Sequence, residues 1–103
     1  MKRITKQRLL SQLTANQQQV QSFGVKKLGL FGSYVRDEAT PTRDIDLLVE
    51  FEPGNKNFNN FVHLSFYLEE LFQKKVELVT PESLSPYIGP NILAEVEYVA
   101  FNQ

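Results

Sequence analysis

GLFGSYVRDEATPTRDIDLLVEF, residues 29–51, is the stretch that decides the fold. It contains two apolar, strand-like runs separated by a Gly-Ser turn and a polar loop. The second run, residues 44–51, is apolar at every odd position and has Asp44 and Asp46 at even positions. Because side chains alternate across a strand, the odd positions are expected to face the core and the two aspartates to leave the other face together.

The rest of the chain extends this pattern to a small mixed β-sheet flanked by helices, an α/β or α+β fold. Apolar residues at helical spacing and turn signals such as Gly24 and Pro81 set the boundaries. We expect helices over residues 4–22, 58–72 and 86–94, a short helical turn over 34–38, and strands over 25–31, 44–51, 76–80 and 96–101, the last of which could instead continue the preceding helix. The helix over 58–72 is long enough for a crossover, so the strands on either side could be parallel.

Length and composition predict one domain, residues 1–103, with its core at 24–98 and residues 1–23 as an N-terminal amphipathic helix. The chain has no cysteine, which excludes disulfides and thiolate metal sites and fits a reducing compartment. There is no apolar run long enough to span a membrane, and the N-terminus lacks the pattern of a signal peptide. We therefore expect a cytoplasmic protein without a membrane partner.

The net charge of −1 hides an asymmetry between the two parts of the chain. Residues 1–36 contain seven basic residues and no acidic one, whereas residues 37–103 contain four basic residues and all twelve acidic ones. The first part suits phosphate or an acidic partner, or is a solvated helix face, and the second suits cations. Because the domain is not basic overall, we expect no nucleic-acid partner.

Gly32 and Ser33 follow the first strand and are candidates for a phosphate-binding turn. Glycine allows the backbone to approach a phosphate closely, N–H groups at the start of a helical turn attract anions, and the serine hydroxyl can donate a hydrogen bond. The alternative is an ordinary strand-to-helix turn with a serine cap. The pattern of a P-loop is missing, so the phosphate site predicted here is of another kind.

Asp44 and Asp46 are candidates for a divalent metal site, since Mg²⁺ is held by a few carboxylates together with water and substrate phosphates. Glu77 alternates with Val76 and Leu78 on the third strand and is expected on the same side as the aspartates. A third carboxylate there could bind a second metal or accept a proton from an attacking hydroxyl. Exposed surface acids are the alternative interpretation of all three residues.

The motifs G-S-Y-x-R, D-I-D-L-L-V and V-E-L-V-T together resemble the minimal nucleotidyltransferase (MNT) family of the DNA polymerase β superfamily over residues 24–98. The paired motif, in which Asp44-Ile45-Asp46 begins eleven residues after Ser33, is more specific than either half. The resemblance implies a polymerase β-like fold and transfer of a nucleoside monophosphate from an NTP to a hydroxyl, with two Mg²⁺ ions and release of pyrophosphate.

The resemblance also implies a role for each matching residue. Gly32 and Ser33 would hold the triphosphate, and Arg36 would neutralise or position it. The catalytic carboxylates and metal ligands would be Asp44, Asp46 and Glu77, with Glu77 as the base. The chain departs from the family pattern in having Asp37 where glycine is frequent, Arg43 before the first aspartate, and glutamate instead of aspartate at position 77.

The short chain leaves no residues for a second domain that would grip an acceptor. Free-standing members of the family resemble antitoxins that silence HEPN-domain ribonuclease toxins by adding AMP from ATP to a toxin tyrosine. We therefore expect a HEPN toxin as partner, and homo- or hetero-oligomers are consistent with this. Two alternatives stay open: an antitoxin that acts by binding with vestigial catalysis, and a nucleotidyltransferase acting on a small molecule such as an antibiotic.

Overall fold

The structure is a computed structural model that describes residues 4–101. Its central feature is a sheet whose strands lie in the order β3-β2-β1-β4. In chain order the elements are α1 (Lys6–Ala15), α2 (Gln17–Gln21), β1 (Val25–Phe31), the 3₁₀ turn η1 (Gly32–Tyr34), β2 (Ile45–Phe51), α3 (Phe58–Phe72), β3 (Val76–Val79), the 3₁₀ turn η2 (Pro81–Ser83), α4 (Gly89–Glu95) and β4 (Glu97–Tyr98).

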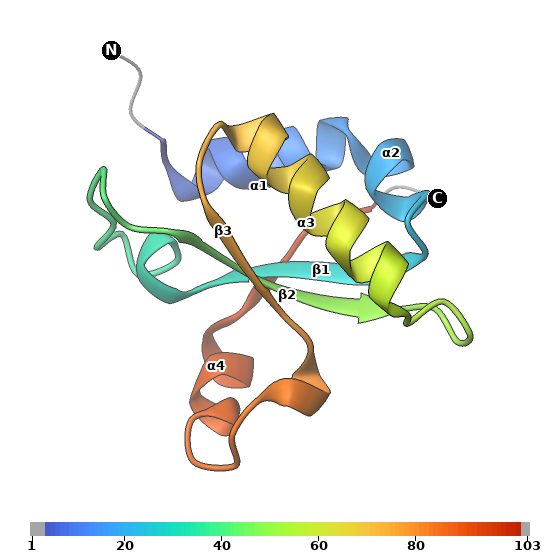
Figure 1. Cartoon of the computed structure of the whole chain (residues 1–103). Helices are drawn as coiled ribbons and strands as arrows, with labels where there is room; N and C mark the ends of the chain where they lie inside the picture. The colour runs from blue at the N-terminus through green and yellow to red at the C-terminus, as the bar shows by residue number, and fades with distance from the viewer. Residues whose placement is uncertain (1–3, 102–103) are drawn as a thin grey trace.

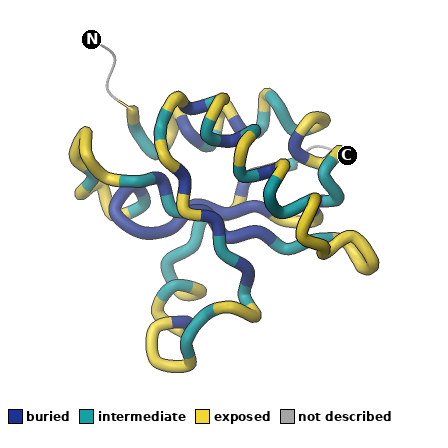
Figure 2. Tube along the Cα trace, in the orientation of Figure 1, coloured by how far each residue is buried: buried dark blue, intermediate teal, exposed yellow. Residues whose placement is uncertain are grey.

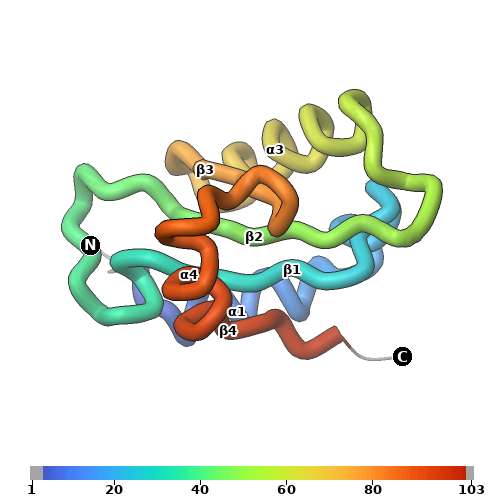
Figure 3. The backbone as a smooth tube through the Cα atoms, turned by 90° about the horizontal axis from the view of Figure 1, so that it is seen from below, coloured from blue at the N-terminus to red at the C-terminus, as the bar shows by residue number. Residues whose placement is uncertain are grey.

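The sheet is mixed, as expected. β2 pairs with β3 in parallel, whereas β1 pairs with β2 and with β4 antiparallel. Helices α1, α2 and α3 cover one face of the sheet, and η2 and α4 lie on the opposite side (Figure 1). Seen from that side, α4 lies in front of the strands (Figure 3). The predicted α+β architecture of a small mixed sheet with flanking helices is therefore confirmed.

The register of the strands places the main core on one face of the sheet and the acids on the other, which also carries the buried Leu48. Ile45, Leu47 and Val49 of β2 have no exposed surface and belong to the core cluster that contains the buried leucines of α1 and α3. The alternate residues of β2 leave the other face, where Asp46 pairs in register with Glu77 of β3. Buried residues accordingly follow the middle of the sheet and the inner sides of α1 and α3 (Figure 2). The acids thus lie opposite the helical layer.

Near both ends of the chain, the observed helices and strand differ from the predicted bounds. The helix expected over residues 4–22 is broken at Asn16, whose side-chain amide donates to the Gln12 carbonyl and competes with the helical backbone. Lys2 and Arg3, part of the predicted basic segment, lie outside the described residues. At the other end α4 is shorter than expected, since its proline lies in the first turn, where helices begin. The last strand is confined to Glu97–Tyr98.

Helix α3 has the predicted bounds, but its apolar residues are not all buried. Leu64 and Leu68 have no exposed surface, whereas Phe58, for which helical spacing allowed either the core or a partner interface, is 79% exposed and outside the core. Phe58 is the first residue after the N-cap Asn57. Phe58 therefore lies at the start of α3, before the part of the helix that packs on the sheet. Among residues 4–101, no helix is long and apolar enough to cross a membrane.

Replacing Leu64 by alanine is expected to lower the free energy of unfolding by about 2–5 kcal/mol, because a fully buried leucine leaves a cavity. Phe66 provides the control on the same helix, since it is 64% exposed and its replacement by alanine should change stability by less than about 0.5 kcal/mol. Chemical denaturation of both variants measures the two values. Equal losses would contradict the packing described here.

Candidate active site

The turn after β1 touches the acid of β2. Gly32 has φ +80°, a left-handed conformation that glycine adopts without strain. A Cβ atom added at Gly32 would collide with the carboxylate of Asp46. Phe31, the residue before it, pairs in register with Asp46 across the antiparallel strands. The predicted phosphate turn and the predicted acidic pair are therefore in contact, because β1 and β2 are neighbours.

The three predicted acids interact electrostatically. Burial raises the pKa of Asp46 from 3.8 to about 6, with further upward contributions from the charges of Glu77 and Asp44. Asp44 directly precedes β2, and its charge adds to burial in raising the pKa of Tyr34. Carboxylates gathered in this way resist ionising together. A cation between them would relieve the repulsion.

The donor set fits a divalent metal only in part. Within residues 4–101, no group of three His, Cys, Asp or Glu side chains is arranged to hold a metal ion. Mg²⁺ requires only one or two carboxylates when substrate phosphates and water complete its shell. Asp44 and Asp46 satisfy that requirement by residue type and proximity. Their metal-binding role, and that of Glu77, stays a prediction.

The remaining predicted residues lie in and after the same turn. Ser33 is 6% exposed and lies within η1. The Arg36 side chain is half exposed, and its Nε donates to Glu38 at 2.9 Å. Tyr34, also in η1, is 4% exposed and belongs to the core cluster. Tyr34 therefore anchors the η1 turn to the core.

Glu95, at the end of α4, is a site residue that sequence reasoning missed. Its Oε2 accepts a hydrogen bond from the Gly32 N–H at 2.7 Å. Its two carboxylate oxygens also accept from Nη1 of Arg36, at 2.9 and 3.1 Å. A glutamate 59 residues from Arg36 gives no local sequence signal of this contact. Only the arrangement of α4 beside the β1 turn brings the three groups together.

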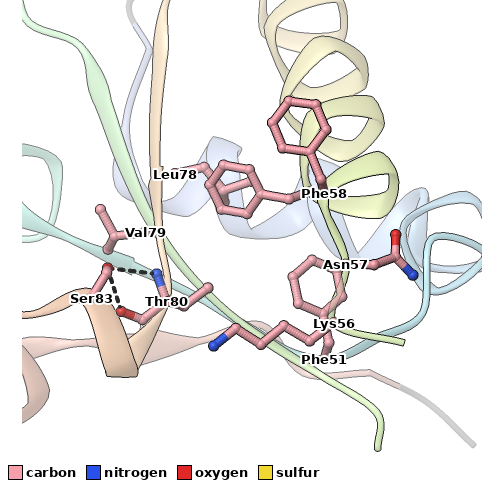
Figure 4. A pocket seen from close by; sticks show the side chains of 9 residues that line it. Phe51, Lys56, Asn57, Phe58, Leu78, Val79, Thr80 and Ser83 are labelled. Atoms are coloured by element: carbon pink, nitrogen blue, oxygen red, sulfur yellow. Dashed lines mark hydrogen bonds between the residues drawn. The ribbon is translucent and has the colours of Figure 1, made fainter. Parts of the chain in front are cut away.

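A separate hollow of about 490 Å³ lies at the carboxyl end of β2. Figure 4 shows Phe51, Phe58 and Leu78 around it, together with the hydrogen bonds between Ser83 and Thr80. Phe51 is five residues from Asp46 on β2, about 16 Å along an extended strand. None of the predicted site residues lines this hollow. Its lining is largely apolar and lacks the carboxylates that the chemistry needs.

Comparison with known proteins shows the family of the chain. The sequence model of the nucleotidyltransferase domain matches residues 11–99. The protein adenylyltransferase MntA of Thermococcus cleftensis is 41% identical over 97 residues, which cover 93% of this chain and 97% of the relative. The chain therefore belongs to the nucleotidyltransferase domain family and is an enzyme of that class.

Solved structures show the same fold. One provisionally assigned as a minimal nucleotidyltransferase has a TM-score of 0.69 and 33% identity, covering 85% of this chain and 93% of that one. An MNT antitoxin in complex with the tri-AMPylated HEPN toxin of Shewanella oneidensis is another match. Its TM-score is 0.56 at 19% identity, with 86% of this chain and 72% of that chain covered. This last likeness concerns the fold alone.

Proposed function

We propose that this chain is a protein adenylyltransferase, which transfers AMP from ATP to the hydroxyl of a tyrosine on a HEPN-domain toxin and thereby acts as its antitoxin. The observation that carries the proposal is the contact between the Gly32 turn and Asp46, which is itself in register with Glu77. The relative of Thermococcus cleftensis supports protein adenylylation. The Shewanella oneidensis complex supports a HEPN partner.

The reaction assigns a distinct task to each group. The acceptor hydroxyl oxygen attacks the α-phosphorus of ATP, the bond from that phosphorus to the α–β bridging oxygen breaks, and pyrophosphate leaves. Glu77 accepts the hydroxyl proton, while Ser33 and Arg36 hold the triphosphate. Asp44 and Asp46, with Glu77, would bind two Mg²⁺ ions. Bound there, the ions would neutralise the triphosphate and the departing pyrophosphate.

The acceptor comes from outside the chain in this proposal. The polar face of the sheet carries the acids and the turn, whereas the opposite face is filled by α1 and α3. A toxin side chain would therefore approach from the side on which α4 lies. The proposal includes a cytoplasmic location, where ATP is available, and an assembly of the chain with its partner.

Incubation with Mg²⁺ and ATP labelled at the α-phosphate is expected to transfer label to the product of the adjacent reading frame, which the proposal expects to be a HEPN-domain protein. Chelation of the metal with EDTA should abolish the labelling, and excess Mg²⁺ should restore it. Replacing the labelled tyrosine of the partner by phenylalanine should also abolish it. Absence of label on the partner, or equal labelling by Asp44→Ala and the wild type, would refute the proposed activity.

Two departures from the family pattern favour a second function, neutralisation of the toxin by binding alone. Asp37 stands where the family frequently has glycine, and it adopts φ +58°, a conformation that favours glycine. Glu77, one methylene longer than aspartate, is the second departure in the site. A double variant, Asp44→Ala with Asp46→Ala, separates the two functions in cells that express the toxin. Loss of neutralisation supports the transferase, and full neutralisation by the double variant supports binding alone.

A further inference from the structure

We propose that Glu95 is a positioning residue of the nucleotide site, whose carboxylate holds the Gly32 turn and Arg36 in the arrangement that receives the triphosphate of ATP. This inference rests on the proposed function and extends it to α4. Glu95 itself is not expected to touch the reacting atoms. It acts through the two groups that it binds.

The Glu95 carboxylate connects Gly32, at the start of the turn, with Arg36, the cation that follows the turn. One carboxylate accepts from the Gly32 N–H at 2.7 Å and from Nη1 of Arg36 at 2.9 Å. Hydrogen bonds between charged groups are shorter and stronger than neutral ones. The Glu95 side chain is 24% exposed, against 50% for that of Arg36, so the carboxylate is the better shielded partner. Removing it would release both donors at once.

The backbone around Glu95 is fixed against β1, which makes the residue a rigid support. The next residue, Val96, packs so closely on Gly29 that a Cβ atom there would lie 2.5 Å from Val96 Cγ2. The following two residues form β4, in register with Gly29 and Leu30. The carboxylate therefore extends from a segment that the sheet holds in place. A surface glutamate on a loose loop would not define the turn in this way.

Holding Arg36 also keeps it from the acids that would bind metal. Arg36 is one of the two cations whose charge lowers the pKa of Asp46, so it lies within electrostatic reach of that carboxylate. Without Glu95, the guanidinium would keep its contact with the exposed Glu38 only, which leaves less to oppose its attraction to Asp46, where it would compete with a divalent cation. Of its donors, Nε is used by Glu38 and Nη1 by Glu95. Nη2 is then the nitrogen assigned to a phosphate oxygen.

The contact also concerns the predicted phosphate role of Gly32, whose N–H donates to Glu95 in this structure. With that N–H on Glu95, Ser33 and Arg36 make the phosphate contacts in this proposal. The phosphate contact of Gly32 itself stays a prediction. Gly32 contributes by letting the backbone turn beside Asp46 without a side chain.

A different role for the Glu95 contact predicts the opposite change in ATP binding, so one measurement distinguishes the two roles. If the carboxylate only occupied the place of a phosphate oxygen, ATP would have to displace it, and removing it would tighten ATP binding. If Glu95 positions the turn and Arg36, removing it weakens ATP binding. The two roles therefore predict changes of opposite sign in the dissociation constant.

The experiment is a calorimetric titration of the full chain with ATP and Mg²⁺, for the wild type, Glu95→Ala and Glu95→Gln. We expect Glu95→Ala to raise the Kd for ATP at least tenfold. Glu95→Gln should give a smaller increase, because its amide oxygen still accepts from the Gly32 N–H but carries no charge for Arg36. In transfer assays KM for ATP should rise more than kcat falls.

Glu97→Gln is the matched control, since Glu97 pairs with Lys6 of α1 at 2.8 Å on the helical side of the sheet. It loses an ion pair two residues away and should bind ATP like the wild type. An unchanged or lower Kd in both Glu95 variants overturns the inference, and Glu95→Gln serves this purpose even if the alanine variant does not fold. A wild-type chain that binds no ATP would instead refute the proposed function, and this inference with it.

Discussion

Replacing Asp46 by asparagine is expected to lower the rate of adenylyl transfer by at least about 10³-fold, because the carboxylate that would hold the metal ions is lost. The shape of the side chain is retained, so the fold should be unaffected. Glu70→Gln is the control, since Glu70 is an exposed acid of α3 on the other side of the sheet. Transfer rates of the two variants are compared with labelled ATP. A variant of Asp46 that keeps a tenth of the wild-type rate would remove this residue from the catalytic group.

The same substitution is expected to stabilise the metal-free protein at neutral pH. The pKa of Asp46 is raised from 3.8 to about 6 by burial and by the charges of Glu77 and Asp44. The folded chain thus binds this proton more tightly than the unfolded chain does, and the wild type loses stability as the pH rises through that range. The asparagine variant has no such loss. At pH 7 its free energy of unfolding should exceed that of the wild type by about 1–2 kcal/mol, after allowance for solvent screening.

Denaturation at two pH values, with EDTA present, measures this effect. At pH 3.5, below both values of the pKa, the carboxyl is mostly protonated in the folded and unfolded chains, and the stability difference should fall below about 0.5 kcal/mol. A difference that persisted unchanged at pH 3.5 would show that packing, not charge, distinguishes asparagine from aspartate here. A less stable variant at pH 7 would contradict the raised pKa.

Gly32→Ala is expected to have the second-largest effect, at least about a 10²-fold loss of transfer, which is the scale for removing one well-placed stabilising group. The substitution has two physical consequences. A side chain at φ +80° costs about 1–3 kcal/mol of backbone strain. The new Cβ would also collide with the Asp46 carboxylate, so that the turn or the acid must move.

Gly54→Ala isolates the second consequence. Gly54 has φ +84°, but a Cβ atom there would meet no atom within 4 Å. Both variants should therefore lose similar backbone stability, whereas only Gly32→Ala should lose transfer beyond what that instability explains. Rates measured well below both melting temperatures make the comparison. Equal activity of the two variants would mean that the contact between Gly32 and Asp46 is not needed.

Some features followed from local patterns alone. The alternation over residues 44–51 predicted β2 within one residue, and it placed Asp46 on the face away from the core, because side chains alternate along any extended strand. The helical spacing over residues 58–72 gave the bounds of α3 for a similar reason. Periodicity left open whether Phe58 belongs to the core or to a partner interface, since it does not show where the sheet beneath a helix ends; the structure leaves Phe58 exposed.

Local patterns did not predict which residues contact one another across the fold. The spacing of Gly32-Ser33 and Asp44-Ile45-Asp46 indicated one site, yet the contact between Gly32 and Asp46 exists because β1 and β2 pair with Phe31 opposite Asp46. Likewise, Glu77 lies opposite Asp46 because β2 and β3 pair in parallel with these two residues in register. The sequence identified Glu77 as a candidate, but it did not give the distance between Glu77 and Asp46.

By itself, the sequence determined the class of fold and the strand segments near the acids, and it predicted candidate residues for phosphate and metal, because these depend on residue type and short-range periodicity. The tertiary structure alone decided which of these groups touch. It placed Glu95 on the Gly32 N–H and Arg36, a contact between residues 63 and 59 positions apart. Such a contact depends on the pairing of β4 with β1 and on the packing of Val96 on Gly29, which no local pattern encodes.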